Sequence, residues 1–370
     1  MPKFLTIFPN AENVHLIKDV GMIPYTLHRE YGYDSTIASY KNGVYPYYET
    51  EVKGITQVFI SKKFNNEILN VCWFILMNFR KYDILQCYHI SEQSLIYLNL
   101  FKILKGLTFS KSFTYLKLDL NDFINDMKFS KKVLFLLKRT NLISVETKKM
   151  HNHLNENNIF GKTVELIPNG FNNNQKREIL DFNFKENLII TVGRIGSSEK
   201  NNEVLLEAFK DLAKVNSEWK LELIGPIEKD FQAYIDNYYY ENPNLISRVM
   251  FTGNISDRES LQEKYNKAKI FALTSPKEGF PLVFLEAIKS GCSLISPKFS
   301  SAIDVTCDEK YGSLFEIGNY KLLSQKMLEL VDNPIKLEMD CVQIQNFAYD
   351  NFTWKKICGD IDKLLNFVST

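Results

Sequence analysis

Residues 278–286 read EGFPLVFLE, and this stretch carries the clearest fold signal in the sequence. It follows an apolar run that predicts a strand, and its own apolar spacing predicts a short helix that stops at Gly291. Glu278 therefore falls in a strand-to-helix loop, and Glu286 is expected about two turns into the helix. Pro281 suits the first helical turn, where a missing N–H costs little.

The start of this expected helix suggests a ligand. Free backbone N–H groups at a helix start favour an anion, most often phosphate. An acid before this point and a second acid after it suggest a ligand with hydroxyl groups on both sides of a phosphate. A nucleotide sugar has that shape. Each glutamate could also be an ordinary surface residue.

Strand patterns alternate with amphipathic helix patterns, which predicts parallel α/β layers. We expect strands at 4–8, 36–39, 84–88, 113–116, 142–145, 164–167, 188–192, 220–224, 249–252, 270–274, 293–296 and 313–315. We expect helices at 22–31, 66–79, 91–105, 130–138, 202–213, 231–240, 260–268, 320–331, 335–349 and 354–367.

The turn PNG at 168–170 and the polar run after it predict a domain linker. The expected fold is α/β, with two doubly wound, Rossmann-like domains facing across a cleft that holds the ligand. The first domain spans residues 1–170 and would bind the acceptor, and the second spans 171–350. A C-terminal helix at 351–370 would pack back on the first domain.

Composition limits the possible functions. The 370 residues carry a net charge of +1, so overall charge predicts no nucleic-acid binding. Six cysteines show no CxxC pair, which favours reduced thiols in a cytoplasmic protein. We identify no signal-peptide pattern at the N-terminus, and the longest apolar run, near 71–77, is far too short for a membrane span.

A second motif, TVGR at 191–194, ends an expected strand, and Lys200 follows it. Two cations at a strand end can neutralise the charge that grows on a diphosphate leaving group. Taken alone, Arg194 and Lys200 could equally be solvated loop residues.

Together, the ordered motifs resemble the family 4 retaining glycosyltransferases of the GT-B fold. The similarity covers about residues 165–365, and the first half matches only in architecture. The matching segments are IPNGF (167–171), VGR (192–194) with Lys200, LEAF (206–209), LIG (223–225), FTG (251–253), SPKEGFP (275–281), the pair Glu278 and Glu286, and FTW (352–354).

The resemblance implies a role for each matched position. Arg194 and Lys200, with the Gly193 loop, would hold the donor diphosphate, and Glu286 would accept both ribose hydroxyls. Glu278 would be catalytic by positioning the sugar and stabilising charge. The remaining donor contacts would come from the backbone of Gly279, Phe280, Leu282 and Val283 and, at the base, from Asn254 and Ile255.

The resemblance also implies retention of anomeric configuration, a UDP-linked donor and no cofactor or metal, and the chain has no DxD pair placed to bridge a diphosphate. His89, after the strand at 84–88, is a second catalytic candidate near the acceptor, although it could simply be packed or exposed. Asp119 is a weaker acceptor-side candidate.

Two segments depart from the family pattern. The N-terminal loop, NAENVH at 10–15, lacks the usual adjacent glycines, and Gly21 follows only later. After the second acid, SSAID at 300–304 replaces a common Gly-Gly turn followed by Glu. We therefore expect that loop to tolerate positive φ less readily.

The first half of the chain is basic. Residues 1–170 carry 21 Lys and Arg against 15 Asp and Glu, whereas residues 171–370 carry 24 against 29. Between 101 and 149, lysines interleave with aromatic residues, and 129–139 could be an amphipathic helix on an anionic membrane. It could also be an ordinary helix with solvated lysines. The basic and aromatic residues are Lys102, Lys105, Lys111, Lys117, Lys128, Lys131, Lys132, Lys138, Arg139, Lys148, Lys149, Phe109, Phe113, Phe123, Phe129 and Phe135.

The leading hypothesis is a transferase that extends a glycan, lipid-linked, in bacterial capsule or lipopolysaccharide synthesis, in the cytoplasm or at the inner face of the membrane. The alternative is a non-catalytic GT-B partner that binds glycan or stabilises another transferase. An epimerase-like or phosphorylase-like enzyme would need a pyridoxal lysine or an inverting base, and no motif supports either.

Overall fold

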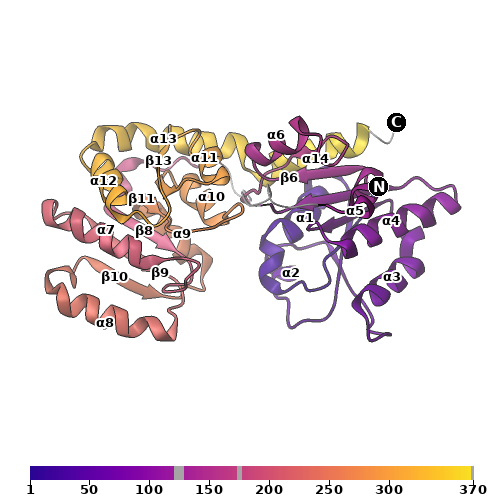
Figure 1. Cartoon of the computed structure of the whole chain (residues 1–370), viewed down its shortest axis with the longest axis horizontal. Helices are drawn as coiled ribbons and strands as arrows, with labels where there is room; N and C mark the ends of the chain where they lie inside the picture. Colours follow the sequence, from indigo (N-terminus) through magenta and orange to yellow (C-terminus); the bar gives the residue numbers. More distant parts are fainter. Residues whose placement is uncertain (121–128, 173–176, 368–370) are drawn as a thin grey trace. The chain divides into compact units, whose positions relative to one another are not determined.

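The computed structural model describes residues 1–120, 129–172 and 177–367, and the chain divides into two compact units (Figure 1). The first unit is Met1–Asn174 with Phe352–Thr370, and the second is Gln175–Asn351. The sequence-based boundaries at 170 and 350 lie within a few residues of these. The last segment of the chain thus belongs to the first unit.

The first unit holds a parallel sheet in the order β3-β2-β1-β4-β5-β6-β7. Most of its strands are buried apolar runs, as a sheet covered on both faces requires. The strands are β1 (Lys3–Ile7), β2 (Asp34–Ser39), β3 (Thr56–Phe59), β4 (Ile84–Tyr88), β5 (Phe113–Leu118), β6 (Leu142–Val145) and β7 (Glu165–Leu166).

Two hydrophobic cores cover the two faces of this sheet, because side chains alternate along each strand. Leu5 and Ile7 of β1 face a core built with α3, α4, α5 and α6, whereas Phe4 faces a core built with α1 and α14. The helices are α1 (Asp19–Tyr31), α2 (Tyr47–Thr50), α3 (Glu67–Asn78), α4 (Glu92–Leu107), α5 (Lys131–Arg139), α6 (Lys148–Glu156) and α14 (Trp354–Phe367).

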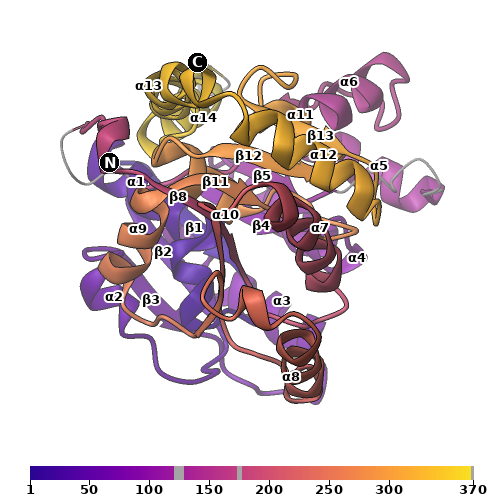
Figure 2. The same cartoon turned by 90° about the vertical axis from the view of Figure 1, so that its left-hand side faces the viewer.

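The second unit repeats this plan with a parallel sheet in the order β10-β9-β8-β11-β12-β13. On one face, α7 and α12 lie side by side (Figure 2). The strands are β8 (Glu186–Val192), β9 (Lys220–Ile224), β10 (Val249–Gly253), β11 (Ala268–Ala272), β12 (Ser293–Pro297) and β13 (Gly312–Phe315). The helices are α7 (Asn202–Val215), α8 (Gln232–Glu241), α9 (Arg258–Lys267), α10 (Leu282–Lys289), α11 (Ser300–Val305), α12 (Tyr320–Val331) and α13 (Pro334–Asn351).

Each sheet has a point where the strand order reverses. The chain builds outward from β1 and then continues on its other side with β4; it does the same with β8 and β11. Ligands of open α/β sheets bind at the carboxyl ends of strands at such a point. The expected ligand sites are therefore at the carboxyl ends of β1 and β4 in the first sheet, and of β8 and β11 in the second sheet.

Candidate functional site

Three glycines mark the carboxyl edge of the second sheet. Gly193 follows β8, Gly225 follows β9, and Gly253 ends β10. Gly225 has φ +141, and a Cβ there would lie 1.8 Å from the carbonyl oxygen of Gly193. Its N–H donates to the Gly253 carbonyl over 2.9 Å. Only glycine allows these backbone segments to approach so closely.

An ion pair joins the two halves of this edge. Nζ of Lys200 lies 2.5 Å from Oε1 of Glu278, and both side chains are about four-fifths buried. The Thr274 hydroxyl donates to the Lys200 carbonyl over 2.8 Å, which ties the β8 side of the edge to the β11 side. A Cβ on Gly193 would lie 3.2 Å from Cε of Lys200, so glycine leaves room for the lysine stem.

Arg194 is not part of this pair. Its guanidinium pairs with Glu199, and 53% of its side chain is exposed. The sequence thus placed Arg194 and Lys200 in one loop, but in the structure only Lys200 contacts Glu278. The exposed guanidinium is available to an incoming anion.

The helix α10 begins beside this ion pair. Pro281 precedes it with ψ 125, an extended conformation, so the expectation that Pro281 occupies the first helical turn is wrong. Leu282 and Val283 form that first turn, where N–H groups have no partner within the helix. Before it, Gly279 is half-buried and the Phe280 ring is buried. Gly279 and Phe280 thus lead directly into the helix start.

Glu286 lies one turn further along α10 and is held by a tyrosine. The buried Tyr265 of α9 donates its hydroxyl to Oε2 of Glu286 over 2.9 Å. Burial raises the pKa of Glu286, against the opposing effects of the Tyr265 hydrogen bond and of Arg258 and Lys289. The hydrogen bond fixes one carboxylate oxygen, so the carboxylate is oriented before any ligand arrives.

A buried acid supports the strand end at the expected base site. Glu222 of β9 accepts hydrogen bonds from the Thr252 hydroxyl (2.5 Å) and from Lys264 (2.6 Å). Thr252 precedes Gly253, after which Asn254 is exposed and Ile255 half-buried. The Asn254 amide donates to the Ser256 hydroxyl over 3.0 Å.

Sequence reasoning missed both supporting contacts. Lys264 and Tyr265 are neighbours on α9, and they hold Glu222 and Glu286 respectively. In the sequence, Lys264 and Tyr265 resemble ordinary helix residues, because neither belongs to one of the motifs described above. A buried Glu222 inside an apolar strand was the one available signal.

Residues 172–346 match the family model of glycosyl transferases group 1. The matched region contains every candidate donor residue from Gly193 to Glu286.

Curated relatives match part of the chain. The capsular polysaccharide biosynthesis glycosyltransferase CapM of Staphylococcus aureus is 26% identical over 221 residues, covering 54% of this chain and 56% of the relative. A Campylobacter jejuni N-acetylgalactosaminyltransferase, named for a diphospho-undecaprenol substrate, is 25% identical over 229 residues, covering 60% and 58%. The chain spans about half the length of the curated relatives it matches.

Solved structures match the whole chain in fold. The Anabaena Alr3699/HepE complex with UDP and glucose has a TM-score of 0.69 at 17% identity, covering 99% of this chain and all of that one. The lipopolysaccharide outer core galactosyltransferase WaaB has a TM-score of 0.71 at 17% identity, with complete coverage of both chains. The two Rossmann-like units therefore have the GT-B fold that the sequence predicted.

His89 lies in the first unit, outside the region that matches the family model. It follows β4 with φ +60 and is exposed, and its ring centre lies 5.9 Å from that of Phe8, which follows β1, with the two ring planes tilted by 56°. It therefore stands at the point where the strand order of the first sheet reverses. Asp119, after β5, is exposed.

The N-terminal loop offers no glycine at this edge. Gly21 lies inside α1, where a Cβ would be 2.1 Å from the carbonyl oxygen of Leu16, so close packing explains this glycine. Glu12 and Asp19 instead flank the short 3-10 helix Asn13–Ile17. Two acids at the helix starts are unfavourable to phosphate.

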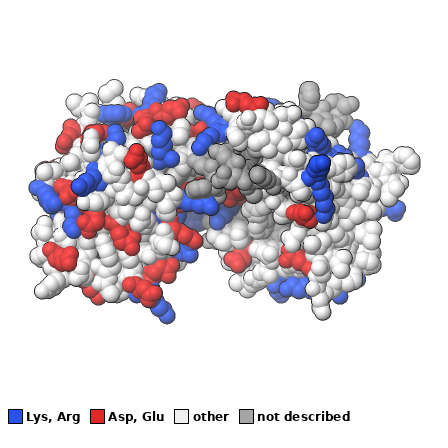
Figure 3. Space-filling view, viewed as in Figure 1, with Lys and Arg blue, Asp and Glu red and all other residues white. Residues whose placement is uncertain are grey.

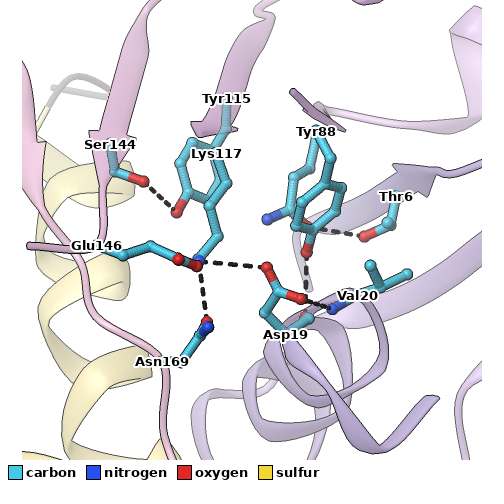
Figure 4. A network of polar contacts seen from close by, with 10 residues as sticks. Thr6, Asp19, Val20, Tyr88, Tyr115, Lys117, Ser144, Glu146 and Asn169 are labelled. Atoms are coloured by element: carbon cyan, nitrogen blue, oxygen red, sulfur yellow. Dashed lines mark hydrogen bonds and ion pairs between the residues drawn. The ribbon is translucent and has the colours of Figure 1, made fainter. Parts of the chain in front are cut away.

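A buried charge network surrounds Lys117 (Figure 4). Nζ of Lys117, on β5, contacts Oδ2 of Asp19 at 3.2 Å, Oδ1 of Asn169 at 3.0 Å and the Glu146 carboxylate. The backbone N–H of His89 donates to the Lys117 carbonyl over 3.1 Å. One lysine thus links α1, β5, the segment after β6 and the linker.

The charges of this network depend on one another. Although burial opposes a charged lysine, the Glu146 and Asp19 carboxylates raise the pKa of Lys117. Burial raises the pKa of Glu146, with Lys117 acting against it. Oε2 of Glu146 is buried and has no hydrogen-bond partner among the residues that the structure describes.

Two members of the basic and aromatic set between residues 101 and 149 are not on the surface. Lys117 and Lys105 are both buried, and Lys105 lies 3.8 Å from Asp83. Phe123 and Lys128 of the same set lie outside the described residues.

SSAID at 300–304 was expected as a loop, and the structure has helix α11 there.

Within residues 1–120, 129–172 and 177–367, no helix is long and apolar enough to cross a bilayer. Nor do those ranges contain a group of three or more His, Cys, Asp or Glu side chains placed to hold a metal ion. All six cysteines are free thiols.

Proposed function

We propose that this protein is a retaining glycosyltransferase. It would move a sugar from a nucleotide-diphosphate donor, UDP-linked, to a lipid-linked glycan in bacterial surface polysaccharide synthesis. The observation that carries the proposal is the contact between Lys200 and Glu278 beside the start of α10, at the reversal point of the second sheet.

The names of the similar proteins support this choice of substrates. CapM is a capsular polysaccharide enzyme, and the Campylobacter relative is named for a diphospho-undecaprenol substrate. Structures of Alr3699/HepE contain UDP, glucose or UDP-glucose. A UDP-sugar donor and a glycan on a lipid diphosphate are therefore the first substrates to test.

In this proposal the diphosphate lies between Lys200, the exposed Arg194 and the first N–H groups of α10. As the bond between the anomeric carbon and the β-phosphate oxygen breaks, negative charge grows on that oxygen. The two cations stabilise the charge, so the proposed reaction uses no metal and no cofactor. Lys200 must partly leave Glu278 to reach the phosphate, and this frees the carboxylate.

Glu278 then accepts hydrogen bonds from sugar hydroxyls and stabilises positive charge at the anomeric carbon. The acceptor hydroxyl attacks from the side that the phosphate leaves, which retains the configuration. The acceptor's proton passes to the departing phosphate oxygen. Glu278 forms no covalent bond in this scheme, since its task is positioning and charge stabilisation.

Glu286 would bind the ribose hydroxyls, with Tyr265 holding its carboxylate in place. The base would lie against Asn254 and Ile255, at the strand end supported by Glu222. The backbone of Gly193, Gly279, Phe280, Leu282 and Val283 would complete the donor site.

His89 would act from the acceptor side. We expect His89→Ala to lower the turnover number of glycosyl transfer while leaving the affinity for UDP unchanged, because the proposed UDP contacts lie in the region that matches the family model. Enzyme turnover and UDP titration calorimetry measure the two quantities separately. Equal losses in both would remove His89 from the catalytic set.

The proposed function is tested by screening nucleotide-diphosphate sugars in thermal unfolding, since a cognate donor raises the melting temperature by mass action. Hydrolysis and transfer of the best donor are then measured. Lys200→Ala and Glu286→Ala should each lower both by at least about 10²-fold. Lys214→Ala and Glu218→Ala, which change exposed residues of the same unit, should leave both unchanged.

Normal donor turnover in both Lys200→Ala and Glu286→Ala would end the transferase proposal. Binding of UDP without turnover of any donor would instead favour the non-catalytic GT-B partner.

A lipid-linked acceptor places the reaction at the cytoplasmic face of a membrane. Peripheral contact through residues 101–149 was the expectation from sequence, and it remains a prediction.

A further inference from the structure

Helix α3 is apolar on nearly its whole circumference. Its sequence, EILNVCWFILMN, has one charged residue, at its first position. Val71, Phe74 and Ile75 are buried in the core of the first unit. A helix that is apolar all round is normally buried on every side.

The outer side of α3 is nevertheless open. Its apolar side chains are exposed by 36% to 61%, and they recur at the spacing of a single helical face. The residues are Leu69 (53%), Trp73 (36%), Leu76 (44%) and Met77 (61%). Such a continuous apolar face marks an interaction surface rather than scattered exposure.

Cations stand at both ends of the helix. Lys62 and Lys63 precede it, Arg80 and Lys81 follow it, and all four are exposed. Nζ of Lys63 lies 4.8 Å from the centre of the Trp73 ring. The arrangement is an apolar stripe with positive charge at each end.

The apolar surface continues beyond α3. Helix α4 packs against α3, and at its carboxyl end Ile103 and Leu107 are exposed. Just beyond, Phe109 is almost fully exposed at φ +52, a backbone conformation that costs energy for a bulky residue. Figure 3 shows a largely uncharged surface over α3 and α4.

We propose that the α3 face, defined as Leu69, Trp73, Leu76 and Met77 with Lys62, Lys63, Arg80 and Lys81, docks on an anionic lipid bilayer. A helix lying in the bilayer interface buries one apolar face, with a tryptophan at the headgroup level. Cations at both ends then meet anionic headgroups at the same depth. A protein groove would not require positive charge at both ends.

The sequence predicted membrane contact through helix α5, but the exposed side of α5 is charged, whereas that of α3 is apolar. Leu137 is buried and Val133 and Leu134 pack against the core, so the helix turns Lys131 and Lys132 to solvent. Its apolar face is therefore largely occupied by its own unit, and Phe135 is the apolar residue of α5 that stays mostly exposed, at 60%. The inference moves the expected lipid contact from α5 to α3.

Intrinsic fluorescence tests the contact directly. Of the three tryptophans, Trp219 and Trp354 are buried, and only Trp73 is exposed. Mixing the full chain with vesicles of phosphatidylcholine and phosphatidylglycerol in equal parts should shift the emission to the blue, and Trp73→Phe should remove the shift. Vesicles of phosphatidylcholine alone should give a much smaller change.

Vesicle flotation with paired variants locates the surface. Lys62→Glu with Lys63→Glu should weaken binding to the anionic vesicles by more than about thirtyfold, and Trp73→Ser with Leu76→Ser about tenfold or more. Lys131→Glu with Lys132→Glu is the matched control on α5 and should bind like the wild-type chain. Thermal unfolding should be nearly unchanged in all three variants, because the changed side chains are exposed.

Three results would overturn the inference: no binding of the wild-type chain to anionic vesicles, loss of binding only in the α5 variant, or a concentration-dependent dimer that Trp73→Ser with Leu76→Ser dissolves. The dimer would assign the α3 face to a second copy of the chain. The inference rests on the proposed function only through the lipid-linked acceptor. Vesicle binding is measured without donor, so its failure leaves the donor chemistry untouched.

Discussion

The two sheets reverse their strand order in the same way, yet the charges at the two edges differ in burial. In the second unit, Lys200 and Glu278 keep 21% and 17% of their side chains exposed. In the first unit, Lys117 and Glu146 keep 1% and 2%. Both are lysine–glutamate pairs, but only the second unit's pair can be reached by a ligand.

The difference shows how one topology can provide either a binding site or a structural anchor. A partly solvated ion pair exchanges partners at little cost, so a phosphate can replace a carboxylate. A fully buried pair cannot lose a partner without leaving an uncompensated charge. We therefore propose that Lys200 serves donor binding and that Lys117 serves the stability of the fold.

The largest expected effect is on the buried pair. Lys117→Met should destabilise the first unit by about 3–5 kcal/mol, because it strands the Asp19 and Glu146 carboxylates. Chemical denaturation followed by far-UV circular dichroism measures this loss. Adding Glu146→Gln to Lys117→Met should recover part of the lost stability. If Lys117→Met alone left the unfolding midpoint unchanged, the distinction between the two ion pairs would be wrong.

The corresponding change at the exposed pair should act on activity. Lys200→Met should lower donor turnover about 10²–10³-fold, as removal of one charge-stabilising group does. Its stability should fall less than that of Lys117→Met, since the Lys200–Glu278 pair keeps about a fifth of its side chains exposed. Steady-state kinetics and the same denaturation experiment test both statements. A stability loss equal to that of Lys117→Met would contradict the distinction.

A smaller effect, on UDP affinity, is expected at Tyr265, which holds Glu286. Tyr265→Phe should weaken UDP binding about fivefold, because Glu286 loses the hydrogen bond that orients it. Tyr239→Phe, which removes a hydroxyl that donates to the Val249 carbonyl, is the matched control in the same unit. Calorimetric titration with UDP separates the two, and equal losses would deny Tyr265 a specific role.

The smallest effect is a shift in pH dependence. Because burial raises the pKa of Glu286, UDP affinity should begin to fall, as the pH is lowered, at a higher pH than for an ordinary glutamate. The protonated group is a poorer acceptor for ribose hydroxyls. The Tyr265 hydrogen bond lowers this pKa, so Tyr265→Phe should move the loss to still higher pH. If the pH dependence of UDP affinity in Tyr265→Phe were identical to that of the wild-type chain, this would count against a role for Glu286 in UDP binding.

Most of the fold could be predicted from the sequence, because buried parallel strands and amphipathic helices leave strong periodic patterns. The strand at 84–88 and the helix at 320–331 have the expected bounds. β3 was missed, since its half-exposed TQVF lacks an apolar run. α11 was missed because its serines resemble a loop, although the helix buries Ser300 and Ser301.

The site was predictable where backbone chemistry fixes residue type. Gly193 and Glu278 stood out because a close backbone approach and a strand-to-helix junction restrict what can occupy them. Tyr265 and Lys117 did not, because their partners come from distant segments: Tyr265 meets Glu286, and Lys117 meets Asp19. Only tertiary packing turns these residues into parts of a network.

Helix α14 has a consequence for how this chain is made. Its Trp354, Ile357 and Ile361 belong to the same core as Phe4 and Ile23, near the other end of the sequence. During synthesis from the N-terminus, the second unit can emerge whole and fold while the first still lacks one wall. The half that leaves the ribosome first is thus the last to be completed, and until then its exposed sheet face needs protection from aggregation.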